Sequence, residues 1–213
     1  MFVLSQSGAI RRDFDDEDAM MPAQLQNASL APAIGERRIG AVGELAACMS
    51  RACCEAPDGM KDSIKTALER AAADPLLLSA EQRLPASGCY ARHVLYADPP
   101  GRFTIIAIVW APGQFSPPHA HHTWCAYAVH DGDLEETVFA WDAASSRAKP
   151  MPTAIRKIGY SCYAGAGLDQ IHKLGNSGAK PAISIHVYGV ERENIATHVN
   201  RLVETEPEEG KES

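Results

Sequence analysis

The chain has 213 residues, of which 46% are hydrophobic and 22% charged, values typical of a globular domain with a sizeable core. Its 20 basic and 27 acidic residues give a net charge of -7, which argues against a nucleic-acid binder, because such a protein needs a basic face. No apolar run approaches the ~18 residues of a membrane span, and no signal-peptide core precedes Arg11, so the sequence predicts a cytoplasmic protein without membrane contact.

Residues 1–38 mix polar, proline and acidic residues without sustained periodicity, and we predict a flexible segment there. Residues 39–54 and 58–73 are predicted to be helices, the second capped by Asp58, with its apolar side chains on one face. Because they carry no chemical motif, they are interpreted as packing elements. They form the helical part, residues 39–80, of a single domain over residues 39–203, and an acidic tail follows over residues 204–213.

From Pro85 onward the chain consists of short β-branched and aromatic runs separated by glycine and proline. Such spacing predicts an antiparallel barrel or sandwich, with Asp131-Gly132 as a turn between two strands. The expected strands are residues 90–96, 103–110, 123–129, 135–141, 154–160 and 182–190.

Six cysteines are spread along the chain without a CxxC pair, so their spacing fits no zinc ribbon or finger. In a cytoplasmic protein they are expected to be reduced thiols.

The histidine run Pro117-Pro118-His119-Ala120-His121-His122 is the strongest local feature. Residues two apart on a strand point to the same face, so His119 and His121 can bind one metal, whereas His122 points the other way. Neutral imidazole suits iron, zinc, copper or nickel. Taken alone, the run is equally consistent with an incidental surface tract.

The neighbours of this run favour a metal site. The segment Gly113-x5-His119-x-His121-x3-Cys125-x6-Gly132 resembles the first cupin motif, in which a glutamate usually stands in place of Cys125. The resemblance implies a mainly β cupin fold, a double-stranded β-helix or jelly-roll barrel, preceded here by the N-terminal helices.

A second, weaker cupin motif is similar to His172 and Asn176, although Gly167 and Asp169 replace its usual proline and glycine. The implied metal set is therefore His119, His121 and His172. With cysteine in place of the carboxylate, three neutral ligands leave the metal its full charge and open positions. Such a metal favours an anionic, chelating substrate such as a thiolate.

The segment Ile183-Ser184-Ile185-His186-Val187-Tyr188 alternates apolar and polar residues without a break. On an ordinary half-buried strand the polar members would face solvent. In a small barrel they can instead face a ligand-holding interior, where Ser184, His186 and Tyr188 would form a hydrogen-bonded relay beside the metal.

Four pieces between Tyr90 and about Glu191, roughly half of the chain, resemble the cysteine dioxygenase family, which includes bacterial 3-mercaptopropionate dioxygenases. Tyr90-Ala91-Arg92 is similar to the family's Tyr-x-Arg, whose arginine binds the substrate carboxylate. The other three pieces, in chain order, are Trp110 to His121, the third-ligand segment IHKLGN at 171–176, and the triad Ser184-x-His186-x-Tyr188.

The resemblance implies a thiol dioxygenase that uses Fe(II) and O2 to oxidise L-cysteine to cysteine sulfinate, a step of cysteine catabolism toward taurine. Tyr188, His186 and Ser184 are then the catalytic triad, and Arg92 with Tyr90 binds the substrate carboxylate. Family members with arginine at the position of Arg92 tend to act on cysteine, and those with glutamine on 3-mercaptopropionate.

The family also implies a covalent alternative at Cys125. Some members carry a cysteine that crosslinks to the triad tyrosine, and many bacterial members carry glycine there. Cys125 falls at or next to that position, so it is the candidate thioether partner of Tyr188.

Three other functions remain open. The substrate could be 3-mercaptopropionate or another small thiol, and the cupin could catalyse another metal-dependent reaction, such as an isomerisation. A non-catalytic cupin that senses a metal or small molecule is the alternative of another class. The sequence leaves the oligomeric state open.

Overall fold

The computed structural model describes residues 25–27 and 35–206, and for residues 25–27 and 35–39 it describes the backbone alone. Residues 1–24, 28–34 and 207–213 lie outside the described residues, so most of the predicted flexible segment and acidic tail cannot be compared. The domain boundaries stay a prediction. Of the expected tail, residues 204–206 pair through their backbone with Ala148.

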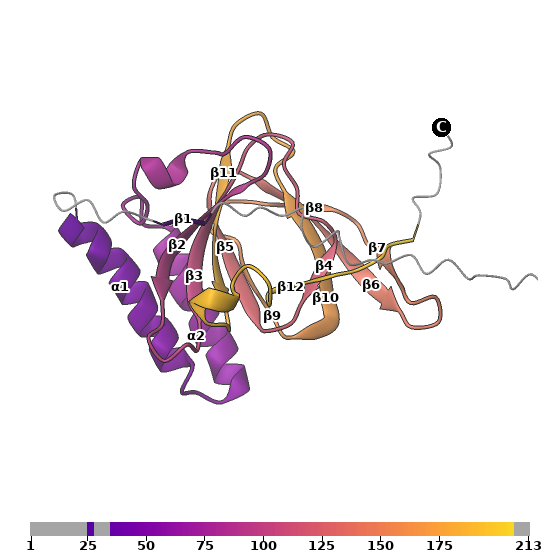
Figure 1. Cartoon of the computed structure of the whole chain (residues 1–213), viewed down its shortest axis with the longest axis horizontal. Coiled ribbons are helices and arrows are strands. Elements are labelled where there is room, and N and C mark those ends of the chain that lie inside the picture. Colours follow the sequence, from indigo (N-terminus) through magenta and orange to yellow (C-terminus); the bar gives the residue numbers. More distant parts are fainter. Residues whose placement is uncertain (1–24, 28–34, 207–213) are drawn as a thin grey trace, which may run out of the picture.

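Two β-sheets make up the body of the protein (Figure 1). The first sheet contains, in spatial order, β1 (Leu25–Asn27), β2 (Ala91–Ala97), β3 (Thr104–Trp110), β11 (Ala182–Tyr188), β5 (Cys125–Asp131) and β9 (Ser161–Ala164). The second contains β12 (Asn200–Leu202), β4 (His119–His121), β10 (Gly167–Gly175), β6 (Leu134–Asp142) and β7 (Arg147–Pro150), and β8 (Ala154–Arg156) pairs with β6. Except for β1 beside β2, neighbouring strands are antiparallel.

Two helices, α1 (Gly35–Ala52) and α2 (Pro57–Ala72), cover the outer face of the first sheet, at the left of Figure 1. Their buried side chains, among them Leu45, Ile64 and Leu68, pack against alternate residues of β3 and β11. The expected cap at Asp58 is wrong: α2 begins one residue earlier, at Pro57, with Ala56 before it and no side-chain cap. Proline suits this first position because the amide hydrogen that it lacks would have no partner there.

The other face of the first sheet points toward the second sheet. Ile106, Ile108 and Trp110 of β3 lie on it with Tyr188 of β11 and form a second buried cluster. Every residue of β3 and β11 is buried, because helices cover one face and the second sheet covers the other. The polar residues of β11 therefore face the interior between the sheets.

The predicted fold class, a mainly β double-stranded barrel preceded by helices, is confirmed. The strand expected over 154–160 ends at Arg156, because the chain turns at Gly159, where φ is +84°. The short strands β7, β9 and β12 were not predicted. Short 3-10 helices lie at η2 (Glu81–Arg83) and η3 (Arg192–Asn194).

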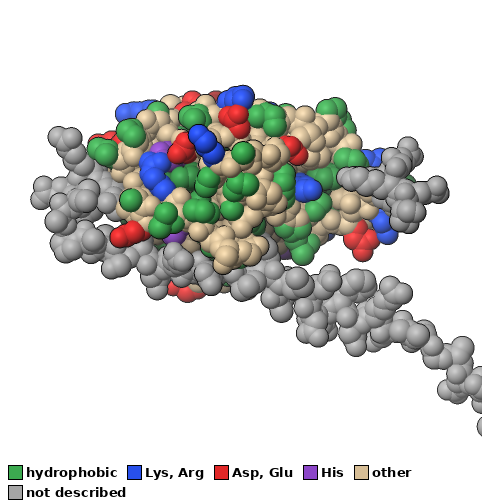
Figure 2. Space-filling view, turned by 90° about the horizontal axis from the view of Figure 1, so that it is seen from above, with side chains coloured by type: hydrophobic (Ala, Val, Ile, Leu, Met, Phe, Trp, Pro, Cys, Tyr) green, Lys and Arg blue, Asp and Glu red, His purple; other side chains and the backbone are tan. Residues whose placement is uncertain are grey.

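On the face shown in Figure 2, basic side chains lie singly among acidic and hydrophobic ones. Among the helices in the described part of the chain, none combines the length and the apolarity needed to cross a bilayer.

Candidate active site

Three histidines come together between the sheets. His119 and His121 lie on β4, and His172 lies on the neighbouring strand β10, directly opposite His119. One nitrogen from each ring lies within 4.8 Å of the other two, and the ring centroids are 4.7 to 5.3 Å apart. The two-residue spacing on β4 places both of its imidazoles on the inner face, whereas His122 is exposed.

Burial keeps the two imidazoles on β4 neutral. It lowers the pKa of His119 to about 3 and that of His121 to about 2, and the neighbouring histidines lower both further. Neutral imidazole is the form that binds a metal.

Hydrogen bonds orient two of the three rings. The Nδ1 atom of His119 lies 2.9 Å from the carbonyl oxygen of Pro117, and that of His172 lies 2.8 Å from Oε1 of Glu136. Both partners are acceptors, so Nδ1 carries the proton in each ring and Nε2 offers its lone pair. Nδ1 of His121 is buried without a hydrogen-bond partner among the described residues.

Glu136 on β6 is itself buried and paired. Arg156 on β8 donates to its Oε2 at 2.7 Å, while Oε1 faces His172. Burial by itself raises the pKa of Glu136, but the hydrogen bonds from His172 and Arg156, together with the charge of Arg156, outweigh it and hold the pKa below its ordinary value. Glu136 is therefore a carboxylate at neutral pH.

A chain of hydrogen bonds runs along β11 on the facing sheet. Nε1 of Trp110 donates to Oγ of Ser184 at 2.9 Å, Oγ lies 2.8 Å from Nε2 of His186, and Nδ1 of His186 lies 3.2 Å from the Tyr188 hydroxyl. Burial lowers the pKa of His186 well below its ordinary value, so the ring is neutral and carries one proton.

The direction of these bonds follows from their donors. The indole of Trp110 only donates, so Ser184 accepts from it. Among the described residues, Nε2 of His186 is the acceptor available to the Ser184 hydroxyl. The His186 proton therefore sits on Nδ1 and is donated to the oxygen of Tyr188. His186 does not use the hydroxyl hydrogen of Tyr188, which the sulfur of Cys125 accepts.

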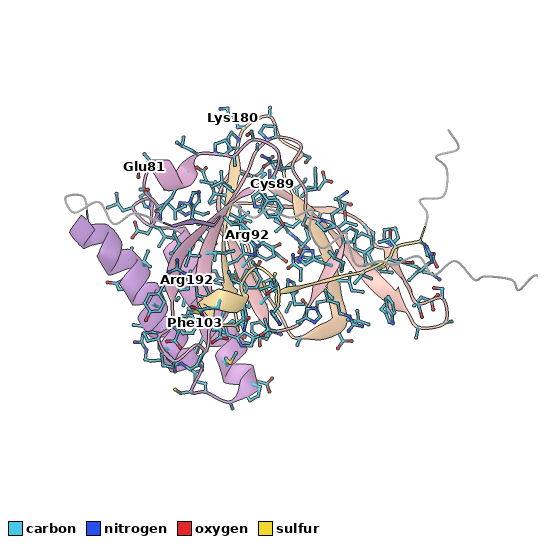
Figure 3. The ribbon with its side chains drawn as sticks, in the orientation of Figure 1. Glu81, Cys89, Arg92, Phe103, Lys180 and Arg192 are labelled. Atoms are coloured by element: carbon cyan, nitrogen blue, oxygen red, sulfur yellow. The ribbon has the colours of Figure 1, made fainter. Side chains whose placement is uncertain are left out.

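Arg92 reaches the same space from β2 on the first sheet (Figure 3). It is 5% exposed, and its Nη2 donates to the carbonyl oxygen of Ile195 at 3.4 Å. An inner cavity lies between the sheets, and its lining includes Tyr90, Arg92, His119, His172, Tyr188 and Asn200. Nε of Arg92 and Oδ1 of Asn200 are both buried and lack hydrogen-bond partners among the described residues.

Cys125 and Tyr188 are directly opposite each other on the paired strands β5 and β11. Their side chains share a hydrogen bond. Burial is the main cause that raises the pKa of the Cys125 thiol and of the Tyr188 hydroxyl well above their ordinary values. Both groups are therefore protonated at neutral pH.

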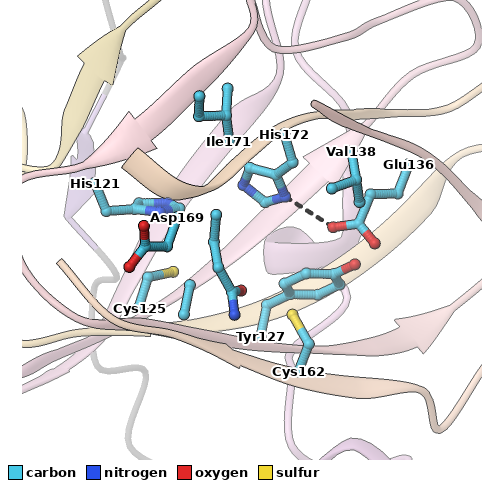
Figure 4. A pocket seen from close by; sticks show the side chains of 11 residues that line it. His121, Cys125, Tyr127, Glu136, Val138, Cys162, Asp169, Ile171 and His172 are labelled. Carbon is cyan, nitrogen blue, oxygen red and sulfur yellow. Dashed lines mark hydrogen bonds and ion pairs between the residues drawn. The ribbon is translucent and has the colours of Figure 1, made fainter. Parts of the chain in front are cut away.

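A second, outer cavity of about 270 Å³ lies on the other side of the histidines (Figure 4). Cys125, Tyr127 and Cys162 of the first sheet form one wall, and His172 and Glu136 of the second sheet form the opposite wall. The two cavities share His172.

A divalent transition metal fits this arrangement. Three imidazoles converge, of which the two on β4 are buried and neutral, and those of His119 and His172 have Nδ1 engaged and Nε2 free. The donor set suits iron, zinc, copper or nickel, and three protein ligands leave positions for a substrate.

The family model for "Cysteine dioxygenase type I" matches residues 88–200, which is more than half of the chain. The chain belongs to the cysteine dioxygenase type I family. Two curated relatives are cysteine dioxygenase type 1 of Homo sapiens, 29% identical, and of Bos taurus, 30% identical. Each similarity spans 91 residues, 41% of this chain and 45% of the relative, so the chain covers less than half of the length of these relatives.

Solved structures are similar at lower identity. A double-stranded β-helix domain protein from Klebsiella pneumoniae is 21% identical, with a TM-score of 0.44 over 60% of this chain and 91% of that one. An oxalate oxidase in complex with glycolate is 16% identical, with a TM-score of 0.40 over 55% of this chain and 61% of that one.

The part that matches the cysteine dioxygenase family contains every predicted site residue, and helices α1 and α2 precede it. The predicted residues Tyr90, Arg92, His119, His172, His186 and Tyr188 line one cavity, and His121 belongs to the same histidine cluster but lines the second cavity. Sequence reasoning missed three polar groups of the site, Glu136, Trp110 Nε1 and Asn200. Glu136 had a detectable signal, because strand alternation places this acidic residue on one face with the apolar residues Leu134 and Val138.

Proposed function

We propose that this member of the cysteine dioxygenase family is an Fe(II)-dependent thiol dioxygenase that converts L-cysteine and O2 to cysteine sulfinate. The observation that carries the proposal is the cluster of three histidines on one sheet, two of which line a cavity together with Arg92 and Tyr188 of the other sheet. The histidines provide a metal site, and the facing residues Arg92 and Tyr188 provide carboxylate binding and a hydrogen-bond donor.

His119, His121 and His172 would hold the iron. Bound there, Fe(II) supplies the spin and redox chemistry that lets triplet O2 react with a thiolate, which side chains alone cannot do. The three imidazoles bring no charge, so they favour an anionic thiolate as an additional ligand.

Arg92 binds the carboxylate of the substrate. Its guanidinium is fixed by Ile195, while Nε remains without a protein partner in the described part of the chain. A carboxylate that accepts from a buried guanidinium forms a strong, directional contact. Oδ1 of Asn200 is an acceptor in the same cavity and suits an amine N–H. A donor for a carboxylate and an acceptor for an amine together favour an amino acid such as L-cysteine over 3-mercaptopropionate.

When substrate is bound, Tyr188 turns toward the reacting groups the hydroxyl hydrogen that His186 does not use and that otherwise meets Cys125. The relay from Trp110 through Ser184 and His186 fixes this orientation without moving a charge, because every member is neutral. Such a preset donor stabilises negative charge that develops beside it during the reaction.

We further propose that the reaction occurs in the cytoplasm, since all six cysteines are free thiols.

Oxygen uptake tests the proposal directly. Anaerobically prepared, Fe(II)-loaded protein is offered L-cysteine and 3-mercaptopropionate in parallel, and the product masses are recorded. We expect O2 uptake with L-cysteine and a product heavier by two oxygen atoms. A higher kcat/KM with 3-mercaptopropionate would assign that thiol as the substrate. Bound iron without O2 uptake with either thiol would overturn the dioxygenase proposal.

Replacement of Arg92 by glutamine is expected to raise the KM for L-cysteine about 10- to 100-fold, the equivalent of a lost charge-assisted hydrogen bond. The KM for cysteamine, which has no carboxylate, should change little, whatever its starting value. Steady-state oxygen consumption measures both. Equal increases for the two thiols would show that Arg92 supports the fold of the cavity and does not bind the carboxylate.

We also propose a thioether between Cys125 and Tyr188. Their opposed positions on β5 and β11 support it. Forming the bond removes the thiol hydrogen and one ring hydrogen together with two electrons, which O2 accepts. Aerobic turnover should therefore yield a protein lighter by two hydrogen atoms, with a crosslinked tryptic peptide pair that is absent from Cys125→Ser. An unchanged intact mass after repeated turnover would rule the crosslink out.

A further inference from the structure

We propose that Glu136 is a positioning residue for the metal, which holds His172 in one tautomer and supplies the negative charge that the three imidazoles lack. The inference rests on the proposed function in that it takes His172 as a ligand. It adds an outer partner that the motifs around the histidines do not contain.

The contact between Glu136 and His172 is built into the sheet. Glu136 lies opposite Leu174 on the paired strands β6 and β10, and His172 is two residues from Leu174 on the same face. Cross-strand neighbours on one face are within reach of long side chains. Oε1 of Glu136 consequently lies 2.8 Å from Nδ1 of His172, the contact drawn as a dashed line in Figure 4.

Arg156 holds the carboxylate in place from the other side. Its Nε lies 2.7 Å from Oε2, and its guanidinium lies 4.4 Å from the centre of the Tyr160 ring. With one oxygen on Arg156 and the other on His172, Glu136 cannot rotate without breaking a charge-assisted hydrogen bond. The side chain is 5% exposed, so water is a poor replacement for either partner.

The three histidines differ in the hydrogen-bond partner of their Nδ1 atoms. His119 has a neutral carbonyl oxygen beside Nδ1, and Nδ1 of His121 has no partner among the described residues. His172 alone of the three faces a carboxylate, which polarises its ring and makes Nε2 the strongest donor of the set. The carboxylate that a cupin motif would place at Cys125 is thus replaced by one in the outer shell, which leaves the substrate positions on the metal open.

The test compares Fe(II) binding by wild type, Glu136→Ala and Glu136→Gln in competition with a chelator, without substrate. We expect Glu136→Ala to weaken binding about 10- to 100-fold, the usual effect of removing such a partner. Glu136→Gln keeps an acceptor oxygen but loses the charge, so its affinity should fall between the other two. The midpoint potential of the bound iron should rise in both variants, because the lost negative charge stabilised the ferric state. A merely structural role would not produce that shift.

Glu135→Gln is the matched control, since it makes the same change one residue away, on the opposite face of β6, and should leave both readouts unchanged. Wild-type affinity and potential in a folded Glu136→Gln and Glu136→Ala would overturn the role of Glu136 and leave the proposed function standing. A wild-type protein that binds no iron would overturn both.

Discussion

Replacing His172 by alanine should yield a folded protein that does not retain iron. The substitution removes one of three ligands, and the loss should exceed the roughly 10- to 100-fold that even an outer partner of a ligand costs. The fold should survive, because Glu136 keeps its ion pair with Arg156 and β10 keeps its strand pairing. Oxygen uptake with any thiol should disappear together with the metal.

Iron content after gel filtration, measured against protein concentration, checks this result. His122→Ala is the control, because it removes an exposed imidazole one residue beyond His121 and should retain the wild-type iron content. If His172→Ala kept one iron per chain, the three-histidine assignment would be wrong.

Removal of the Tyr188 hydroxyl should slow turnover while the metal stays bound. We expect Tyr188→Phe to lower kcat about 100- to 1,000-fold, the range for removing one preset hydrogen-bond donor to developing negative charge, with unchanged iron content. The ring keeps its packing against His186, at a centroid distance of 5.7 Å. Nδ1 of His186 loses its acceptor, so the free energy of unfolding should fall by about 1 to 3 kcal/mol.

Steady-state oxygen consumption and iron analysis of the same preparation separate the two effects. Tyr163→Phe makes the same chemical change on β9, beside Trp124 on the helix side of the sheet, and should behave as wild type. Loss of iron in Tyr188→Phe would indicate that the triad supports the metal site structurally and takes no part in turnover.

The local chemistry of the site could be predicted from short sequence patterns. Strand periodicity alone predicted that His119 and His121 share a face, and the alternation from Ile183 to Tyr188 indicated one polar face on β11. The motifs then indicated His172 and Arg92 as members of the same site. These are local properties. Side chains on a strand alternate between its two faces every two residues, and a motif contains the residue types that a given reaction needs.

Only the tertiary structure decided which groups meet. The polar face of β11 is buried because the second sheet lies against it, and no pattern within the strand distinguishes that environment from solvent. Glu136 is 36 residues from His172 in the sequence, and Asn200 lies beyond the motifs on a strand of three residues. Pairing of β6 with β10, and of β12 with β4, brings these side chains to the histidines. The sequence by itself therefore determined the residue types and their strand faces. The register between distant strands, set by packing of the whole barrel, determined their partners.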